Sequence, residues 1–140
     1  MNTHIATAAS VVAAGLLAGS SAFAGNEMAE KFAADRLAAF GSGNAAALVA
    51  QYRPDAVVIT PMGVLNEPAQ IKGMIEGIIA EFGQPSTKFE LISQGAVGEV
   101  VTFVWKADTA KNVYDLGAET YVLKDGMIAY QTFAAKMAPK

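Results

Sequence analysis

The feature that most constrains the fold is the stretch from residue 88 onward, which consists almost entirely of β-strand patterns. Its strongest signal is "YVLKDGMIAYQTFAA", in which Asp125-Gly126 separates two apolar, alternating runs. An Asp-Gly pair between such runs is typical of a two-residue β-hairpin. The strand patterns "KFELISQGAV" and "VVTFVWKAD" precede it. Four consecutive strands with short connections predict an antiparallel sheet.

The first half of the chain carries helical patterns instead. Residues 27–41 and 67–83 each place apolar side chains at helical spacing, and we expect a helix over each range. A shorter helix over residues 45–53 should end before Pro54. A β-branched run at residues 55–61 predicts one early strand. The order predicts an α+β fold, in which three N-terminal helices pack on a curved, mostly antiparallel sheet that forms a cone with a pocket.

The first 24 residues have the layout of a secretory signal peptide. They contain no charged side chain, and an apolar stretch precedes Ala22-Phe23-Ala24, an A-x-A-like cleavage site. The apolar stretch is shorter than the roughly 18 residues of a spanning helix. We therefore expect a periplasmic or secreted protein, a single mature domain over residues 25–140 and no membrane attachment after cleavage. An uncleaved leader that anchors the chain is the alternative.

Composition excludes several kinds of chemistry from the mature chain. There is no Cys, and the only His, His4, lies in the expected leader. Ser-His and Cys-His pairs and zinc sites built on His or Cys are thereby excluded, and we expect no metal and no cofactor. Any catalysis must use carboxylates, Tyr, Lys, backbone groups or water. A net charge of −3, with Lys and Arg scattered singly, predicts no nucleic-acid partner.

Two stretches, "LAAFGSGNAAALVAQYRPDAVVITP" and "YVLKDGMIAYQTFAA", together resemble the nuclear-transport-factor-two-like superfamily. This group of cone-shaped domains includes ketosteroid isomerases and SnoaL-like polyketide cyclases. The resemblance covers nearly all of residues 27–137. It implies the cone fold of a SnoaL-like domain. It does not imply a reaction, since unrelated functions share one fold.

The resemblance also implies where an isomerase would hold its catalytic groups. The Tyr of the first helix corresponds to Arg36, the general-base Asp to Thr60, and the protonated Asp of the hairpin falls near Ala118. Thr60 cannot act as a base at neutral pH, and Arg36 is no neutral phenolic donor. We therefore expect the fold without ketosteroid isomerase activity.

Strand alternation predicts the pocket wall. Lys106 prefers solvent, which turns Trp105 and the alternate residues before it inward. Across the Asp-Gly turn, Thr120 should face Gln131, and the resemblance implies that this side is the interior one. A filled cone, in which these two side chains satisfy each other, is the alternative. The predicted ligand-binding residues are Thr60, Trp105, Tyr114, Thr120, Gln131 and Phe133.

The opposite face of the hairpin predicts a partner surface. Tyr121 and Tyr130 are expected side by side there, with further apolar side chains next to them. An exposed apolar patch of this kind indicates an interaction site. In the superfamily the outer sheet face commonly pairs, so we expect a homodimer through this face.

Three hypotheses for function remain open. The first is an exported protein that binds a small apolar molecule in the cone, with its reaction unknown. The second is an enzyme of isomerase, hydratase or cyclase type that acts on a small apolar substrate without His or Cys. The third is an interaction domain with a filled cone. An open cavity that contains an ionised carboxylate of perturbed pKa would favour the enzyme.

Overall fold

The computed structural model describes residues 13–140, with side chains from residue 26 onward. The predicted leader, residues 1–24, lies wholly outside the described side chains, and its expected cleavage point after Ala24 falls inside the first helix. Export and cleavage therefore stay predictions. None of the helices in the described part of the chain combines the length and apolarity needed to cross a membrane.

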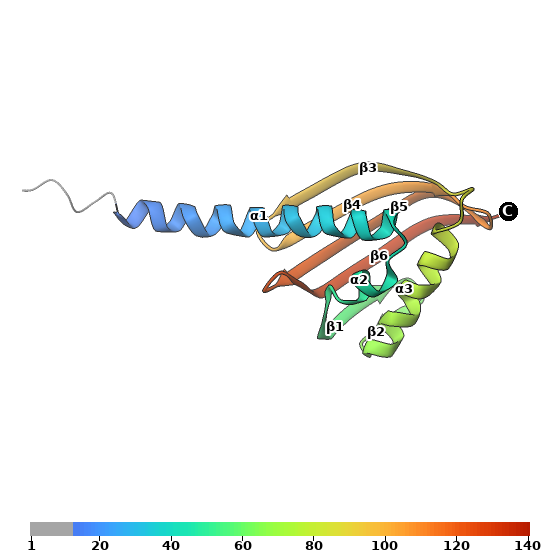
Figure 1. Ribbon diagram of the computed structural model, residues 1–140, viewed down its shortest axis with the longest axis horizontal. Helices are drawn as coiled ribbons and strands as arrows, with labels where there is room; N and C mark the ends of the chain where they lie inside the picture. Colours follow the sequence, from blue (N-terminus) through green and yellow to red (C-terminus); the bar gives the residue numbers. More distant parts are fainter. Residues whose placement is uncertain (1–12) are drawn as a thin grey trace, which may run out of the picture.

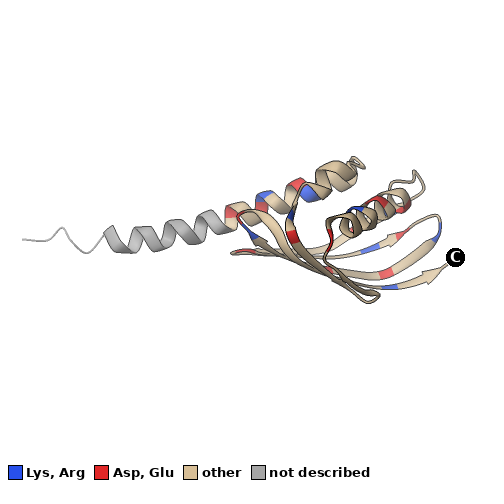
Figure 2. Ribbon diagram, turned by 90° about the horizontal axis from the view of Figure 1, so that it is seen from below, with Lys and Arg blue, Asp and Glu red and all other residues tan. Residues whose placement is uncertain are grey.

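The described chain forms one six-stranded sheet with helices on its concave side (Figures 1 and 2). The strand order is β2-β1-β6-β5-β4-β3, and every neighbouring pair is antiparallel except β1 and β6. The α+β class and the curved, mostly antiparallel sheet are thus confirmed. The elements are α1 (Ala13–Gly41), α2 (Ala45–Val49), β1 (Tyr52–Thr60), β2 (Gly63–Leu65), α3 (Pro68–Phe82), β3 (Lys88–Val97), β4 (Val100–Asp108), β5 (Asn112–Lys124) and β6 (Met127–Pro139).

The helices differ from the prediction in two respects. The third helix follows β1 and β2, so the three helices are not all N-terminal to the sheet. The second helix ends at Val49, and Tyr52 already pairs with Ile128 of β6. Pairing with β6 thus outweighs the helical pattern of this segment. Pro54 lies in the gap of that ladder between Tyr52 and Val57, where its missing N–H costs no hydrogen bond.

Helix α3 begins where local chemistry favours it. The Glu67 backbone N–H donates to Gln70 Oε1 at 3.2 Å, and Pro68 occupies the first turn, where no N–H is needed. The buried face of the helix carries Ile71 and Ile75. This face packs toward the core, so the other residues of α3 remain free to border a cavity.

The β5–β6 hairpin contains a bulge near its turn. Leu123 pairs with Ile128, as a two-residue turn requires, but Val122 pairs with Tyr130. Ala129 is therefore an extra residue on β6. Because side chains alternate along a strand, one extra residue exchanges the inner and outer faces of everything that follows.

This bulge corrects two predictions. Thr120 does not face Gln131: it pairs with Thr132 on the outer side of the sheet, while Gln131 pairs with Tyr121. Tyr121 is 0% exposed and lies in the core, so it cannot contribute to an outer contact with Tyr130, which is 55% exposed. The homodimer itself stays a prediction, and its surface would have to form without Tyr121.

Deleting Ala129 should remove the bulge and exchange the faces of the rest of β6. Thr132 would then turn inward in place of Gln131, and we expect a loss of at least about 3 kcal/mol in the free energy of unfolding. Thermal unfolding followed by circular dichroism measures this. The control Ala129→Ser keeps the residue count and should stay within about 0.5 kcal/mol of the original chain. A deletion variant as stable as that control would contradict the assigned bulge.

Candidate functional site

A cavity of about 1170 Å³ lies between the concave face of the sheet and the helices α1 and α3. Its walls come from the end of α1, the β1–β2 turn, α3 with the loop after it, and the inner sides of β3 to β6. The lining is mainly apolar and aromatic. The lining residues that carry the argument below are Phe82, Phe89, Phe103, Trp105, Tyr114 and Phe133, the carboxylates Glu81 and Glu119, and the glycines Gly73 and Gly77.

The structure brings four of the six predicted residues to this cavity. Thr60, Trp105, Tyr114 and Phe133 line it. Thr60 lies at the β1–β2 turn, where its hydroxyl donates to the Gly63 carbonyl at 3.0 Å. The cavity is open, so the alternative of a filled cone is not what the structure shows. That these four bind a ligand stays a prediction.

The other two predicted residues lie elsewhere. Thr120 is on the outer side of the sheet, as the bulge requires. Gln131 is 3% exposed and faces the interior, but it lies behind the cavity wall. There it accepts a hydrogen bond from Tyr52 Oη at 2.5 Å. Its amide therefore supports the wall and does not border the cavity.

Trp105 forms the centre of an aromatic wall, and a glycine makes room for it. On β4 the predicted alternation is confirmed, with Trp105 buried and Lys106 exposed. Gly117 pairs with Trp105 across β4 and β5, and a Cβ added to Gly117 would lie 2.3 Å from the indole Cε2 atom. Only a residue without a side chain lets the indole lie flat on the sheet. The indole centroid is 6.3 Å from that of Phe133 in a stacked arrangement.

Glu119 is a carboxylate in the cavity wall that the sequence reasoning missed. It faces inward because it shares the inner face of β5 with Tyr121 and Leu123, whereas its neighbour Ala118, near which the resemblance would place an acid, is exposed. Trp105 Nε1 donates to Glu119 Oε1 at 3.1 Å, and the Tyr121 hydroxyl donates to Glu119 Oε2. Burial raises the pKa of Glu119, and the Arg36 charge and the Trp105 hydrogen bond only partly offset this. The group is thus held closer to its neutral form than an exposed glutamate.

Behind Glu119 lies the buried guanidinium of Arg36, which is 1% exposed. Arg36 Nε donates to Tyr121 Oη at 2.9 Å, Nη2 to Tyr52 Oη at 2.9 Å and Nη1 to Gln51 Oε1 at 3.0 Å. The centroid of the Tyr121 ring is 4.7 Å from the guanidinium carbon. Arg36 therefore holds the residues behind the cavity wall and lies one hydroxyl away from the Glu119 carboxylate.

The resemblance related Arg36 and Thr60 to catalytic positions of an isomerase, and the structure shows what they do here. Arg36 is fully engaged behind the wall, and the Thr60 hydroxyl is engaged within its own turn, where it also accepts from Met62 N at 3.1 Å. Within the described residues there is no cluster of three or more acidic or His side chains arranged to hold a metal ion. Acid–base chemistry in the cavity would therefore depend mainly on its two carboxylates, Glu81 and Glu119.

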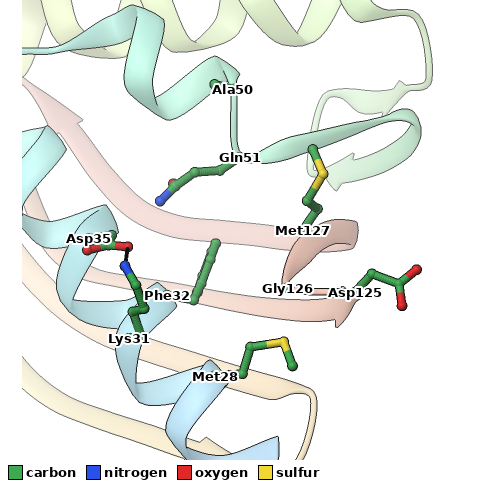
Figure 3. A pocket seen from close by; sticks show the side chains of 9 residues that line it. All are labelled: Met28, Lys31, Phe32, Asp35, Ala50, Gln51, Asp125, Gly126 and Met127. Carbon is green, nitrogen blue, oxygen red and sulfur yellow. Dashed lines mark hydrogen bonds and ion pairs between the residues drawn. The ribbon is translucent and has the colours of Figure 1, made fainter.

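A second, smaller hollow of about 370 Å³ lies between α1, the end of α2 and the β5–β6 turn (Figure 3). Its charged side chains are already engaged. Lys31 pairs with Asp35 at 2.5 Å, and Asp125 lies 3.6 Å from Arg53. Because the charged side chains of this hollow already form ion pairs, we assign no ligand to it.

The curved sheet, the helices on its concave side and the cavity between them define a cone-shaped protein of the NTF2-like kind. The chain belongs to the SnoaL-like domain family, because the model of that family matches residues 33–131. No curated protein matches the sequence.

Solved structures with the same fold share little sequence with this chain. An NTF2-like protein of unknown function from Mesorhizobium loti is 17% identical, with a TM-score of 0.65 over 79% of this chain and 93% of that one. A SnoaL-like protein of unknown function from Burkholderia thailandensis is 16% identical, with a TM-score of 0.62 over 79% and 95%. An LEH-like epoxide hydrolase from M. tuberculosis is 14% identical, with a TM-score of 0.60 over 79% and 84%. At these identities the likeness shows the fold alone.

Replacing Gly117 with Ala should disturb the site through Trp105. The added methyl group overlaps the indole, and we expect a loss of about 1–3 kcal/mol in stability together with a changed Trp105 emission spectrum. Because Trp105 is the only tryptophan, its fluorescence reports on this wall directly. The control Gly73→Ala adds a methyl group that meets nothing within 4 Å on α3, and it should stabilise the protein by about 0.5–1 kcal/mol. Equal stability of the two variants would contradict the packing described for Gly117.

Proposed function

We propose that the protein is an exported, small-molecule-binding member of the SnoaL-like family that holds a mainly apolar ligand in its cone. The observation that carries this proposal is the cavity of about 1170 Å³ with an aromatic lining. Ligand sites in proteins are typically mainly apolar cavities of about 300–1,000 Å³ with a few placed polar groups. Glu119 and the Trp105–Tyr114 wall supply that pattern here.

Two glycines of α3 support the proposal, because they keep the cavity open. Gly73 and Gly77 lie one helical turn apart on the cavity side of the helix, and a Cβ added to either would meet nothing within 4 Å. Glycine in the middle of a helix costs about 0.5–1 kcal/mol relative to Ala. These two glycines therefore lower the stability of the helix although no neighbouring atom requires their small size. A binding site that must stay open next to them would explain this cost.

Filling the space beside Gly77 should block binding without harming the fold. We expect compounds from a library of steroids, aromatic alcohols and small lactones to raise the melting temperature of the original chain and to quench Trp105 fluorescence. Gly77→Leu should be more stable by itself, because helix propensity rises, and should lose the response to those compounds.

The matched control for this experiment is Ala80→Leu, which adds a similar side chain to an exposed position on the same helix outside the cavity. It should keep the full response. If no compound stabilises the original chain, or if Gly77→Leu responds like Ala80→Leu, binding in this cavity is refuted.

A second candidate is an enzyme that uses Glu119 as a general acid or base. The observation that favours it is an inward carboxylate whose pKa is raised by burial, since catalytic acids and bases often have shifted pKa values. The epoxide hydrolase among the structural neighbours supports the view that this fold can hold a reaction. We do not infer from that enzyme which substrate this chain would act on.

Glu119→Gln tests the enzyme proposal. A folded-state pKa above the unfolded value of 4.5 means that the Glu119 contribution to stability is fully present below about pH 4.5 and is lost as pH rises through the folded pKa. Denaturant unfolding between about pH 4 and 8 should therefore show wild-type stability falling relative to Glu119→Gln as pH rises. A bound compound should also be converted by the wild type only. Parallel stability curves, or equal conversion by both proteins, would exclude this role.

A further inference from the structure

Glu81 is a second carboxylate of the cavity, and the structure holds it firmly in place. A single oxygen, Oε1, accepts hydrogen bonds from Thr109 Oγ1 at 2.7 Å, Asn112 Nδ2 at 2.7 Å and Tyr114 Oη at 3.1 Å. These donors come from the end of β4 and the start of β5, so they fix the carboxylate against the sheet. The hydrogen bonds described for this part of the chain do not involve the other oxygen, Oε2.

The carboxylate of Glu81 is ionised at neutral pH. Burial alone would raise its pKa, but the hydrogen bonds from Asn112, Thr109 and Tyr114, with the charge of Lys111, outweigh burial and leave the pKa below its usual value. The anion has the converse effect on its neighbour: burial together with the Glu81 contact raises the pKa of Tyr114 to about 12. Glu81 is thus a fixed negative charge, and Tyr114 is a permanent donor to it.

The local sequence does not explain a negative charge at this place. Glu81 lies in the last turn of α3, where the helix dipole favours cations, and that turn contains no basic residue. Within residues 26–140, Glu81 forms no ion pair with Lys or Arg. The residues that line the cavity include two carboxylates and no Lys, Arg or His. The lining at this end of the cavity is therefore negative, and the one Lys whose charge acts on Glu81, Lys111, lies outside the lining and forms no ion pair with it.

Aromatic rings complete the surroundings. The ring centroids of Phe82 and Tyr114 are 5.1 Å apart, those of Phe82 and Trp105 5.6 Å, and those of Trp105 and Tyr114 5.6 Å. All three residues line the same cavity as Glu81. The faces of aromatic rings, Trp above all, attract cations. The carboxylate, the C-terminus of α3 and the aromatic rings therefore all favour a cation.

We propose that this end of the cavity is a subsite for an ammonium group, so that the ligand is a lipophilic amine whose apolar body fills the aromatic cone. The inference rests on the proposed binding function and narrows its ligand class. A carboxylate ligand would place a second negative charge beside the fixed charge of Glu81. The ammonium group instead supplies a direct ion-pair partner, which Glu81 does not have among residues 26–140, and relieves its repulsion by the end of α3.

Three probes with one apolar body test this inference: the amine, the alcohol and the carboxylate of adamantane, substituted at the same carbon. At pH 7 they differ mainly in charge. Isothermal titration calorimetry and quenching of Trp105 should show the amine binding at least about tenfold more tightly than the alcohol, and the carboxylate most weakly. Added salt should weaken the amine more than the alcohol.

The matched variants are Glu81→Gln and Glu76→Gln, which remove the same charge from the same helix. Glu76 is exposed and pairs with Lys72 at 3.7 Å, outside the cavity. Glu81→Gln should bring amine affinity down to that of the alcohol, whereas Glu76→Gln should preserve the amine preference. Binding of the alcohol to Glu81→Gln shows that the variant is folded.

The outcomes separate the two proposals. If the alcohol binds and the amine has no advantage, or if Glu81→Gln retains the amine preference, the ammonium subsite is refuted while the binding function survives. If none of the three probes binds and the broader library also fails, both proposals fall.

Discussion

The rest of the structure depends on the buried guanidinium of Arg36, which joins α1 to the start of β1 and to β5. A buried charge is tolerated only where its donors find partners. Arg36 finds them in the hydroxyls of Tyr52 and Tyr121 and in the Gln51 amide, with aromatic rings over its faces. Since these partners come from elements far apart in sequence, the charge is accommodated only when the helix lies across the sheet in this way. The cone is the arrangement that satisfies it.

The two carboxylates of the cavity show how one residue type acquires two roles. Glu119 connects through the Tyr121 hydroxyl to the Arg36 charge, and burial raises its pKa. Glu81 lies against three donors, and hydrogen bonding overcomes burial to lower its pKa. Environments that separate the pKa values of paired acids are a mark of functional sites. In this protein Glu119 is held closer to its neutral form, whereas Glu81 carries a fixed negative charge.

Much of the fold could be predicted from local patterns, because the spacing of apolar residues along the chain differs between helices and strands. The main part of α1, α3, the Asp125-Gly126 turn and the inward direction of Trp105 followed from spacing alone. The second helix was predicted too long, since Tyr52 gains more from pairing with β6 than from continuing a short helix. The interior face of the hairpin was wrong for two reasons, the register shift on β5 between Tyr114 and Leu116 and the extra residue Ala129 on β6. No sequence signal distinguishes this residue, as a bulge is decided by how two strands pair.

By itself, the sequence determined the α+β class and the absence of Cys-based chemistry, because composition and periodicity are local properties, and its resemblance to known domains indicated the family. Tertiary structure decided which side chains meet in the cavity. It turned Thr120 outward and Glu119 inward, buried Tyr121 beside Arg36, and placed Glu81 among donors from two strands. These outcomes depend on a one-residue shift in strand pairing and on contacts between distant segments. Such pairing energies arise only when the sheet is assembled, so they cannot be predicted from the individual helices and strands.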